Sequence, residues 1–147
     1  MTISGQDYTT QLGYNSRGEL TSYDYPDGAV VEREYTDRGE LHKIKHNTTV
    51  IDTRVYDDGG RMTSSSYNNT VGETRGYNND NTLASITFSG ASIGNMTYSW
   101  DENKNKTAEA INGTMDDYGF TIPSGGYDKE DRLVSYNRTS GLNQSWS

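Results

Sequence analysis

The sequence predicts an all-β protein built from tandem β-hairpin repeats of about 21 residues that pair into an antiparallel sheet. An aromatic residue followed by a small polar residue recurs at a nearly constant spacing, and the segments between these pairs are short and rich in Thr, Val, Tyr and Ile, as strands are. Only 30% of the 147 residues are hydrophobic and the mean hydropathy is -0.96, yet the chain has 12 Tyr and only 2 Pro. Disordered chains are usually poor in aromatic residues and rich in proline, so the composition favours many short strands joined by tight turns.

The aromatic–polar pairs mark six units, and residues 1–147 are interpreted as a single repeat array. The units start near Tyr14, Tyr35, Tyr56, Tyr77, Trp100 and Tyr127. The first three spacings are 21 residues each, and the last two are 23 and 27 residues. Three equal periods in a row are hard to obtain by chance, and the longest spacing contains an irregular insertion at 112–126.

The position four residues after the aromatic predicts a hairpin turn. It holds Gly18, Gly39, Gly60, Asn81, Lys104 and Asp131. Glycine and asparagine tolerate the positive φ that closes a three-residue hairpin with a G1 bulge. Short polar residues directly after the aromatic, such as Asp57, Asp101 and Asp128, can accept hydrogen bonds from the amides ahead of them. Lys104 fits the turn position worst, which predicts local strain or a different loop in the fifth unit.

Two further columns carry most of the apolar side chains. Six residues after the aromatic come Leu20, Leu41, Met62, Leu83, Lys106 and Leu133. Nine residues after it come Tyr23, Ile44, Ser65, Ile86, Glu109 and Tyr136. Because the two columns have opposite parity, they cannot share one face of a regular strand. Either a bulge near the turn shifts the register, or the leucine column packs at the turn.

The sequence offers no constellation for catalysis, a metal or a cofactor, and we expect no enzyme activity. The net charge of -8 argues against nucleic-acid binding, and no apolar run of 18 residues exists for membrane insertion. His42 and His46 fall in an expected strand, about 13 Å apart, too far for one ion. The acidic pair Asp57-Asp58 lies at a turn, where backbone hydrogen bonding explains it.

One region is the first place to look for a ligand. Aromatic residues concentrate around the fifth unit at Tyr98, Trp100, Tyr118 and Phe120, and the insertion 112–126 follows. Stacked aromatics beside Asn and Asp can bind sugars, and insertions in repeat proteins often form binding loops. The alternatives are that these aromatics pack on neighbouring hairpins and that the insertion is only a linker.

Two segments resemble the YD repeat of the RHS family, whose pattern is Tyr-Asp-x-x-Gly-Arg-Leu. They are Tyr56-Asp57-Asp58-Gly59-Gly60-Arg61-Met62 and Tyr127-Asp128-Lys129-Glu130-Asp131-Arg132-Leu133. The segment from Tyr98 to Lys106 resembles a variant, Tyr-x-Tyr-Asp-x-x-Gly-Asn-Arg, with Lys in place of Gly and of Arg. The resemblance covers about residues 8–147. It implies a curved or spiralling sheet, and for this chain an open fragment of an RHS-type shell.

The resemblance also sets the expectation for function. In toxin members of the family the shell encloses a C-terminal cargo, and in teneurins it is an adhesion scaffold. We expect a non-catalytic structural segment of a large secreted or cell-surface protein, forming part of a shell around a cargo or toxin domain. The alternative is an extracellular carbohydrate- or protein-binding adhesion module.

The expected partners are the remaining repeats of the same longer chain, a further copy through the open sheet edges, and a glycan. The N-terminus lacks the features of a signal peptide, so any targeting signal is expected outside this fragment. Trp146-Ser147 could start a seventh unit.

Overall fold

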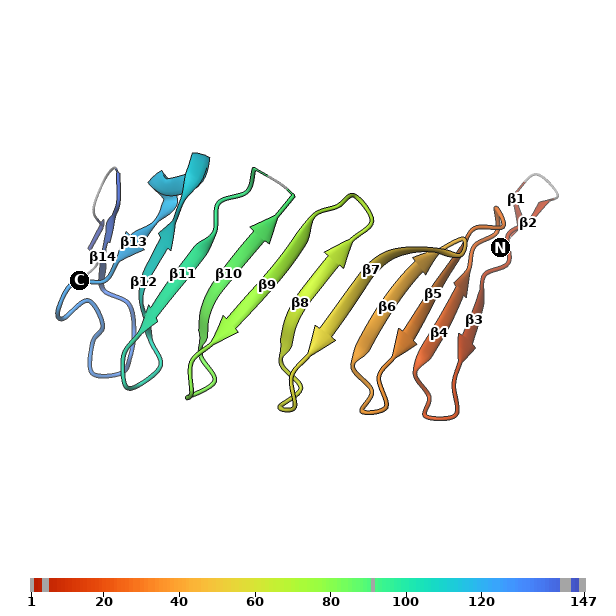
Figure 1. Ribbon diagram of the computed structural model, residues 1–147, viewed down its shortest axis with the longest axis horizontal. Helices are drawn as coiled ribbons and strands as arrows, with labels where there is room; N and C mark the ends of the chain where they lie inside the picture. The colour runs from red at the N-terminus through yellow and green to blue at the C-terminus, as the bar shows by residue number, and fades with distance from the viewer. Residues whose placement is uncertain (1, 4–5, 91, 141–143, 146–147) are drawn as a thin grey trace. The chain divides into compact units, whose positions relative to one another are not determined.

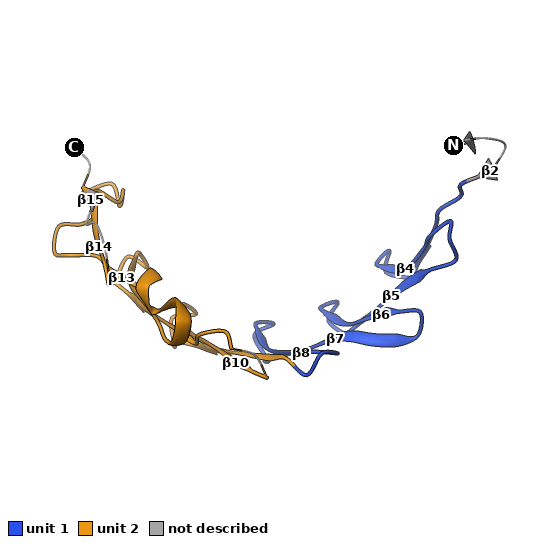
Figure 2. Cartoon of the chain, turned by 90° about the horizontal axis from the view of Figure 1, so that it is seen from above, with its two compact units in different colours: residues 1–70 blue, residues 71–147 orange. Residues whose placement is uncertain are grey.

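The computed structural model describes residues 2–3, 6–90, 92–140 and 144–145, so the start of a seventh unit at 146–147 lies outside the described residues. The chain forms two compact units, 1–70 and 71–147, coloured separately in Figure 2. Both units consist of antiparallel strands in open sheets, which confirms the predicted all-β hairpin architecture. In each unit the hairpin turns lie at one end of the strands and the connections between hairpins lie at the other (Figure 1).

Unit 1 holds a small two-stranded sheet followed by three hairpins. The small sheet pairs β1 (Thr2–Ile3) with β2 (Gln6–Asp7). The hairpins are built from β3 (Gln11–Tyr14) and β4 (Leu20–Asp24), β5 (Val30–Tyr35) and β6 (Leu41–His46), and β7 (Thr49–Tyr56) and β8 (Met62–Tyr67). Each of these strands pairs with its neighbour in sequence, and β3 is the edge strand.

Unit 2 continues the pattern with more irregular spacing. Its first strands are β9 (Gly72–Tyr77), β10 (Leu83–Ser89), β11 (Met96–Trp100) and β12 (Lys106–Ile111). They are followed by the 3-10 helix η1 (Gly113–Tyr118), β13 (Phe120–Thr121), β14 (Ser135–Arg138) and β15 (Gln144–Ser145). The segment 112–126 is more than a loop, because its strand β13 pairs with β12 on one side and with β14 on the other.

A bulge beside the turn of the first five hairpins explains the two apolar columns. In each of these hairpins the aromatic pairs with the residue six positions later, as in Tyr35↔Leu41, and the register shifts by one residue directly after that pair. In the sixth hairpin the same pair, Tyr127↔Leu133, is an isolated bridge. The extra residue restores parity, so Ile44, nine positions after Tyr35, pairs with Arg33 on the face that carries Tyr35. Of the two alternatives left by the sequence, the bulge is the one that the structure adopts.

Within the described ranges, neither unit has a second layer over this aromatic face. Ile111 is the one hydrophobic residue that is buried among those described, and most strand residues are half-buried by their neighbours in the sheet. The low hydrophobic content is therefore the composition of a single-layered sheet rather than of a globular core.

Polar pairs fill part of the aromatic face where a two-layered protein would have aliphatic packing. In unit 1 the buried carboxylate of Asp52 accepts hydrogen bonds from the hydroxyl of Ser65 at 2.5 Å and from Nε of Arg54 at 2.7 Å. Arg33 occupies the same position in the preceding repeat, where Val31 replaces the acid, and its Nη1 is buried without a partner among the described residues.

The repeat aromatics tie one hairpin to the next through their polar atoms. The hydroxyls of Tyr35 and Tyr56 donate to the carbonyls of Leu20 and Leu41 at 2.8 Å. In unit 2 Nε1 of Trp100 donates to Leu83 O at 2.7 Å and the Tyr127 hydroxyl donates to Lys106 O at 2.8 Å. Each acceptor lies six residues after the preceding aromatic, beyond the last backbone pair between the two hairpins. The side chain thus satisfies a carbonyl that the backbone ladder leaves free.

Removing one such hydroxyl tests this link. We expect Tyr56→Phe to lower the free energy of unfolding by about 1 kcal/mol, because the Leu41 carbonyl loses its donor while the ring keeps its packing. Tyr14→Phe is the matched control: Tyr14 is 59% exposed and its hydroxyl has no partner among the described residues. Urea unfolding of both variants measures the difference, and equal losses would contradict the assignment.

Candidate functional site

The candidate functional feature that the six repeats share is the hairpin turn, which runs from each aromatic to the residue six positions later. In every turn the amide one position after the aromatic donates to the carbonyl five positions after it, at 2.8–3.0 Å. The amide of the fourth position donates to the carbonyl of the first, at 3.0–3.1 Å. The six units therefore have one and the same turn.

The fourth turn position has a positive φ in all six turns, between 58° and 91°. Glycine takes this conformation without steric cost at Gly18, Gly39 and Gly60. Lys104 has a φ of 66° and closes the same turn, so the fifth unit has no different loop and instead holds a non-glycine residue in the left-handed region. Its ammonium group donates to the carbonyl of Asp80 in the preceding turn, at 2.8 Å.

The first and fifth positions of each turn form a side-chain pair. Nε of Arg61 donates to Oδ2 of Asp57 and Nε of Arg132 donates to Oδ2 of Asp128, both at 2.7 Å. The other turns use different chemistry for the same contact: Asn15–Glu19, Thr36–Glu40, Asn78–Thr82 and Asp101–Asn105. A carboxylate or amide oxygen at the first position also accepts from two amides ahead of it, as Asp57 Oδ1 does from Gly59 and Arg61 at 2.9 Å.

Arginines of unit 1 connect one turn to the next. The guanidinium of Arg17 donates to Thr36 O at 2.9 Å and to Asp37 O at 2.5 Å. One repeat later, Arg38 donates to Asp57 O at 2.7 Å and to Asp58 O at 2.6 Å. Both arginines stand three positions after their aromatic, so the contact repeats with the period of the chain.

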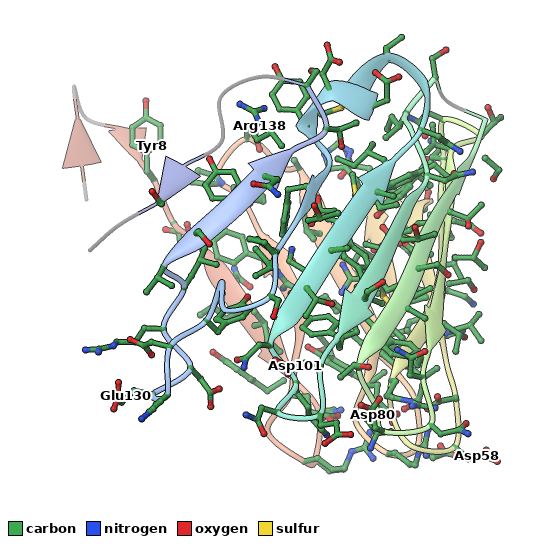
Figure 3. All side chains as sticks on the ribbon, turned by 90° about the vertical axis from the view of Figure 1, so that its left-hand side faces the viewer. Tyr8, Asp58, Asp80, Asp101, Glu130 and Arg138 are labelled. Atoms are coloured by element: carbon green, nitrogen blue, oxygen red, sulfur yellow. The ribbon has the colours of Figure 1, made fainter. Side chains whose placement is uncertain are left out.

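Unit 2 joins its last two turns through amides instead. Nδ2 of Asn103 and Nδ2 of Asn105 donate to Oδ1 of Asp131, at 3.2 and 2.8 Å. Asp80, Asp101 and Glu130 mark this end of the strands of unit 2, whereas Arg138 lies at the opposite end (Figure 3).

The turn carboxylates are stabilised in their charged form. Backbone amides lower the pKa of Asp57, Asp101 and Asp128, and the guanidinium of Arg61 adds to the effect at Asp57. The hydroxyl of Thr36 lowers the pKa of Glu40, and that of Thr82 lowers the pKa of Asp80. These acids are ionised at neutral pH and already hydrogen-bonded, so they lack the raised pKa of a general acid.

A recess of about 360 Å³ opens between the last two turns and the segment 122–126. Its lining combines Asp101, Asn103 and Asp131 with the ring of Tyr127 and the side chains of Ile122 and Pro123. This is the insertion where the sequence directed the search for a ligand.

The aromatic concentration of the fifth unit does not form one exposed row. The ammonium of Lys106 lies over the rings of Tyr98 and Phe120, 5.2 and 5.1 Å from their centroids. Tyr118, the one exposed member of the four at 60%, lies under the guanidinium of Arg138 instead. Three of the four aromatics are therefore engaged within the sheet.

The described residues contain no group of three or more His, Cys, Asp or Glu side chains placed to hold a metal ion. His42 and His46 both lie in β6, and Nδ1 of His42 is 2.8 Å from the carbonyl of Arg54. No helix within the described ranges is long and apolar enough to cross a membrane.

Sequence reasoning missed two columns that the structure makes important. In the sequence, the residue at the fifth turn position changes together with the residue at the first: Arg accompanies Asp, and Glu accompanies Asn or Thr. The third turn position was visible as Arg17 and Arg38, 21 residues apart. Both columns are polar, whereas the search for repeats had weighted aromatic and aliphatic residues.

The turn carboxylates should make the stability of the protein depend on pH in the acid range. A carboxylate whose pKa is lowered in the folded state stabilises the fold at pH values above its ordinary pKa, and that stability is lost as the pH falls through the pKa of the folded state. We expect the free energy of unfolding to fall steadily as the pH drops below about 5. A variant with Asp57→Asn, Asp101→Asn and Asp128→Asn should be less stable at pH 7 but show a flatter dependence on pH, and parallel curves would contradict the assignment.

Known proteins match this chain in structure but not in sequence. No protein-family model matches it, and no curated protein sequence does. A crystal structure of TcdB2-TccC3-TEV is similar with a TM-score of 0.74 at 19% identity, covering 88% of this chain and 7% of that one. The crystal structure of TcdB2-TccC3 without its hypervariable C-terminal region gives the same values.

A Tc holotoxin pore from Photorhabdus luminescens is similar as well, with a TM-score of 0.72 at 18% identity and 88% coverage of this chain. The chain spans only 7% of the length of these solved chains. At this identity the likeness concerns the fold. The chain has the RHS-like repeat fold that its YD motifs predicted.

Proposed function

We propose that the chain is a non-catalytic segment of a shell wall in a larger secreted or cell-surface protein, and that the shell encloses a cargo domain. The observation that carries this proposal is the linkage between repeats. The Tyr35 hydroxyl donates to the neighbouring repeat, and Arg17 donates to two carbonyls of the neighbouring repeat as well as to Glu19 of its own turn. A repeat that completes part of its hydrogen bonds through its neighbours is suited to a continuous wall.

The state of the polar groups supports a structural role. Asp57 accepts hydrogen bonds from backbone amides and from Arg61 at the fifth position of its turn, and Arg38 donates to carbonyls of the next turn. The similarity to Tc toxin structures supports a role in a shell. We propose in addition, by analogy with those toxins, that the shell encloses a cargo and that the whole protein is secreted. The remaining repeats of a longer chain are then its partners.

The modular wall makes a sharp prediction. Excision of residues 35–55 removes one period of 21 residues and places Tyr56 where Tyr35 stood, within reach of the Leu20 carbonyl. We expect this chain to stay folded with a lower unfolding free energy. Excision of residues 35–45 breaks the period and should unfold the strands of unit 1. Circular dichroism and hydrogen exchange distinguish the two, and equal disruption would contradict a modular wall.

A second candidate, a glycan-binding module, is favoured by the recess alone. Its volume and its mixture of carboxylates, an amide and a tyrosine ring suit a small polyhydroxylated ligand. If the recess binds sugars, a glycan array should return hits, and Asp131→Ala should abolish them while Asp58→Ala, in a turn that does not line the recess, should not. A complete lack of hits leaves the wall as the one function proposed.

A further inference from the structure

We propose that the free edge of β3 is a docking surface for one kind of partner, a further repeat hairpin whose turn carries the sequence Arg-Gly-Glu. The proposal rests on the wall function, and it adds a rule for the neighbour of a unit 1 turn, whose fourth position is glycine. The rule follows from the contacts between the three turns of unit 1, which use the same residues in the same places twice over.

The first two turns of unit 1 each have a donor side formed by the third and fifth positions of the turn. In the first turn Arg17 donates to two carbonyls of the second turn, while Oε2 of Glu19 holds the guanidinium at 3.0 Å. In the second turn Arg38 donates to two carbonyls of the third, and Oε1 of Glu40 holds it at 3.1 Å. A planar guanidinium can span two adjacent carbonyls, and its own glutamate fixes its direction.

Each following turn has an acceptor side that matches. The first two carbonyls of the turn receive the arginine, and the aromatic hydroxyl reaches the carbonyl of the preceding leucine. The glycine at the fourth position leaves room for the glutamate: a Cβ on Gly39 would lie 2.8 Å from Oε1 of Glu19, and a Cβ on Gly60 would lie 3.4 Å from Oε1 of Glu40. These glycines therefore have two roles: they adopt the positive φ of their own turn, and they leave space for the glutamate of the preceding turn.

Among the described residues, none occupies this acceptor side at the edge formed by β3. β3 is the last strand of its sheet in unit 1. Tyr14 is 59% exposed and its hydroxyl has no partner within the described residues. In the described part of the chain no atom lies within 4 Å of a Cβ built on Gly18, whereas the same position of the other two turns receives a glutamate. The carbonyls of Asn15 and Ser16 correspond in position to the two carbonyls that accept hydrogen bonds from an arginine in each of the next two turns.

These features select the occupant. A hairpin with aromatic-x-x-Arg-Gly-Glu-Leu supplies the arginine, the glutamate and the leucine carbonyl together, as residues 14–20 and 35–41 do for their neighbours. The sixth turn of this chain carries Glu130 and Arg132 in the third and fifth positions, so it cannot act as the donor. Head-to-tail association of two copies through that turn is therefore not the match for this edge.

The test adds a matched neighbour to the chain. A second copy of residues 14–34 is inserted directly before Tyr14, which places an Arg-Gly-Glu turn next to the turn of residues 15–19. The control chain has the same insertion with Arg17→Gln and Glu19→Gln confined to the added copy. Hydrogen exchange of the amides at 15–19 is the readout, and the amides of β6 and β7 are the internal reference.

We expect the matched insertion to slow exchange at 15–19 by about tenfold more than the control does, because two charge-assisted hydrogen bonds are lost in the control. Equal protection by both insertions overturns the rule but leaves the wall function standing. If neither insertion protects 15–19 while the reference amides stay protected, the edge does not accept a repeat, and the wall function fails with it.

The last experiment uses the original chain, without any insertion. Its exchange at 15–19 is measured from low to high protein concentration, together with its mass by light scattering. We expect no dependence on concentration. Protection that rises with concentration would show that a second copy occupies the β3 edge, and it would overturn the proposal.

Discussion

The hydrogen bond from a repeat aromatic to the carbonyl of the preceding hairpin is the interaction on which the rest of the structure depends. It lies where the backbone ladder between hairpins has ended, so without it the turn ends of neighbouring hairpins would be joined by turn contacts alone. The bond accounts for tyrosine rather than phenylalanine at positions 35, 56 and 127, since the ring there must carry a donor. It also explains how tryptophan substitutes in the fifth unit, because its indole N–H reaches the corresponding carbonyl.

This dependence changes what stability means for such a chain. A globular domain buries an apolar core, whereas here Ile111 is the one buried hydrophobic residue among those described. The aromatic face instead combines half-buried rings with ion pairs such as Arg54–Asp52. Stability therefore accumulates repeat by repeat through interfaces between neighbours, as in other linear repeat proteins.

The sequence predicted the fold class because the aromatic, glycine and leucine columns each have a local physical cause. The hairpin array and its RHS-like fold were both confirmed. The parity of the leucine and isoleucine columns could not be settled, because a bulge is visible only once two strands are paired. The strand β13 was hidden in an apparent insertion, since two residues are too few to show alternation.

The turn row was harder to predict than the sheet. Its hydrogen bonds link positions such as Arg17 and Thr36 that are 19 residues apart, and neither residue is unusual on its own. The sequence predicted strain or a different loop at Lys104 because lysine seldom adopts a positive φ, yet its ammonium group donates a hydrogen bond to the carbonyl of Asp80. Contacts between repeats thus compensate for local preferences that a single turn would violate.

The pair formed by the first and fifth turn positions has an evolutionary consequence. Asp with Arg, Asn with Glu, Thr with Glu, Asn with Thr and Asp with Asn all make the same contact. The two positions can therefore exchange charge for charge, or lose charge altogether, while the backbone of the turn stays the same. The charge of a turn can therefore differ from repeat to repeat, as it does between the turns at Asp57 and Asn78, while the hydrogen bonds of the turn backbone stay the same.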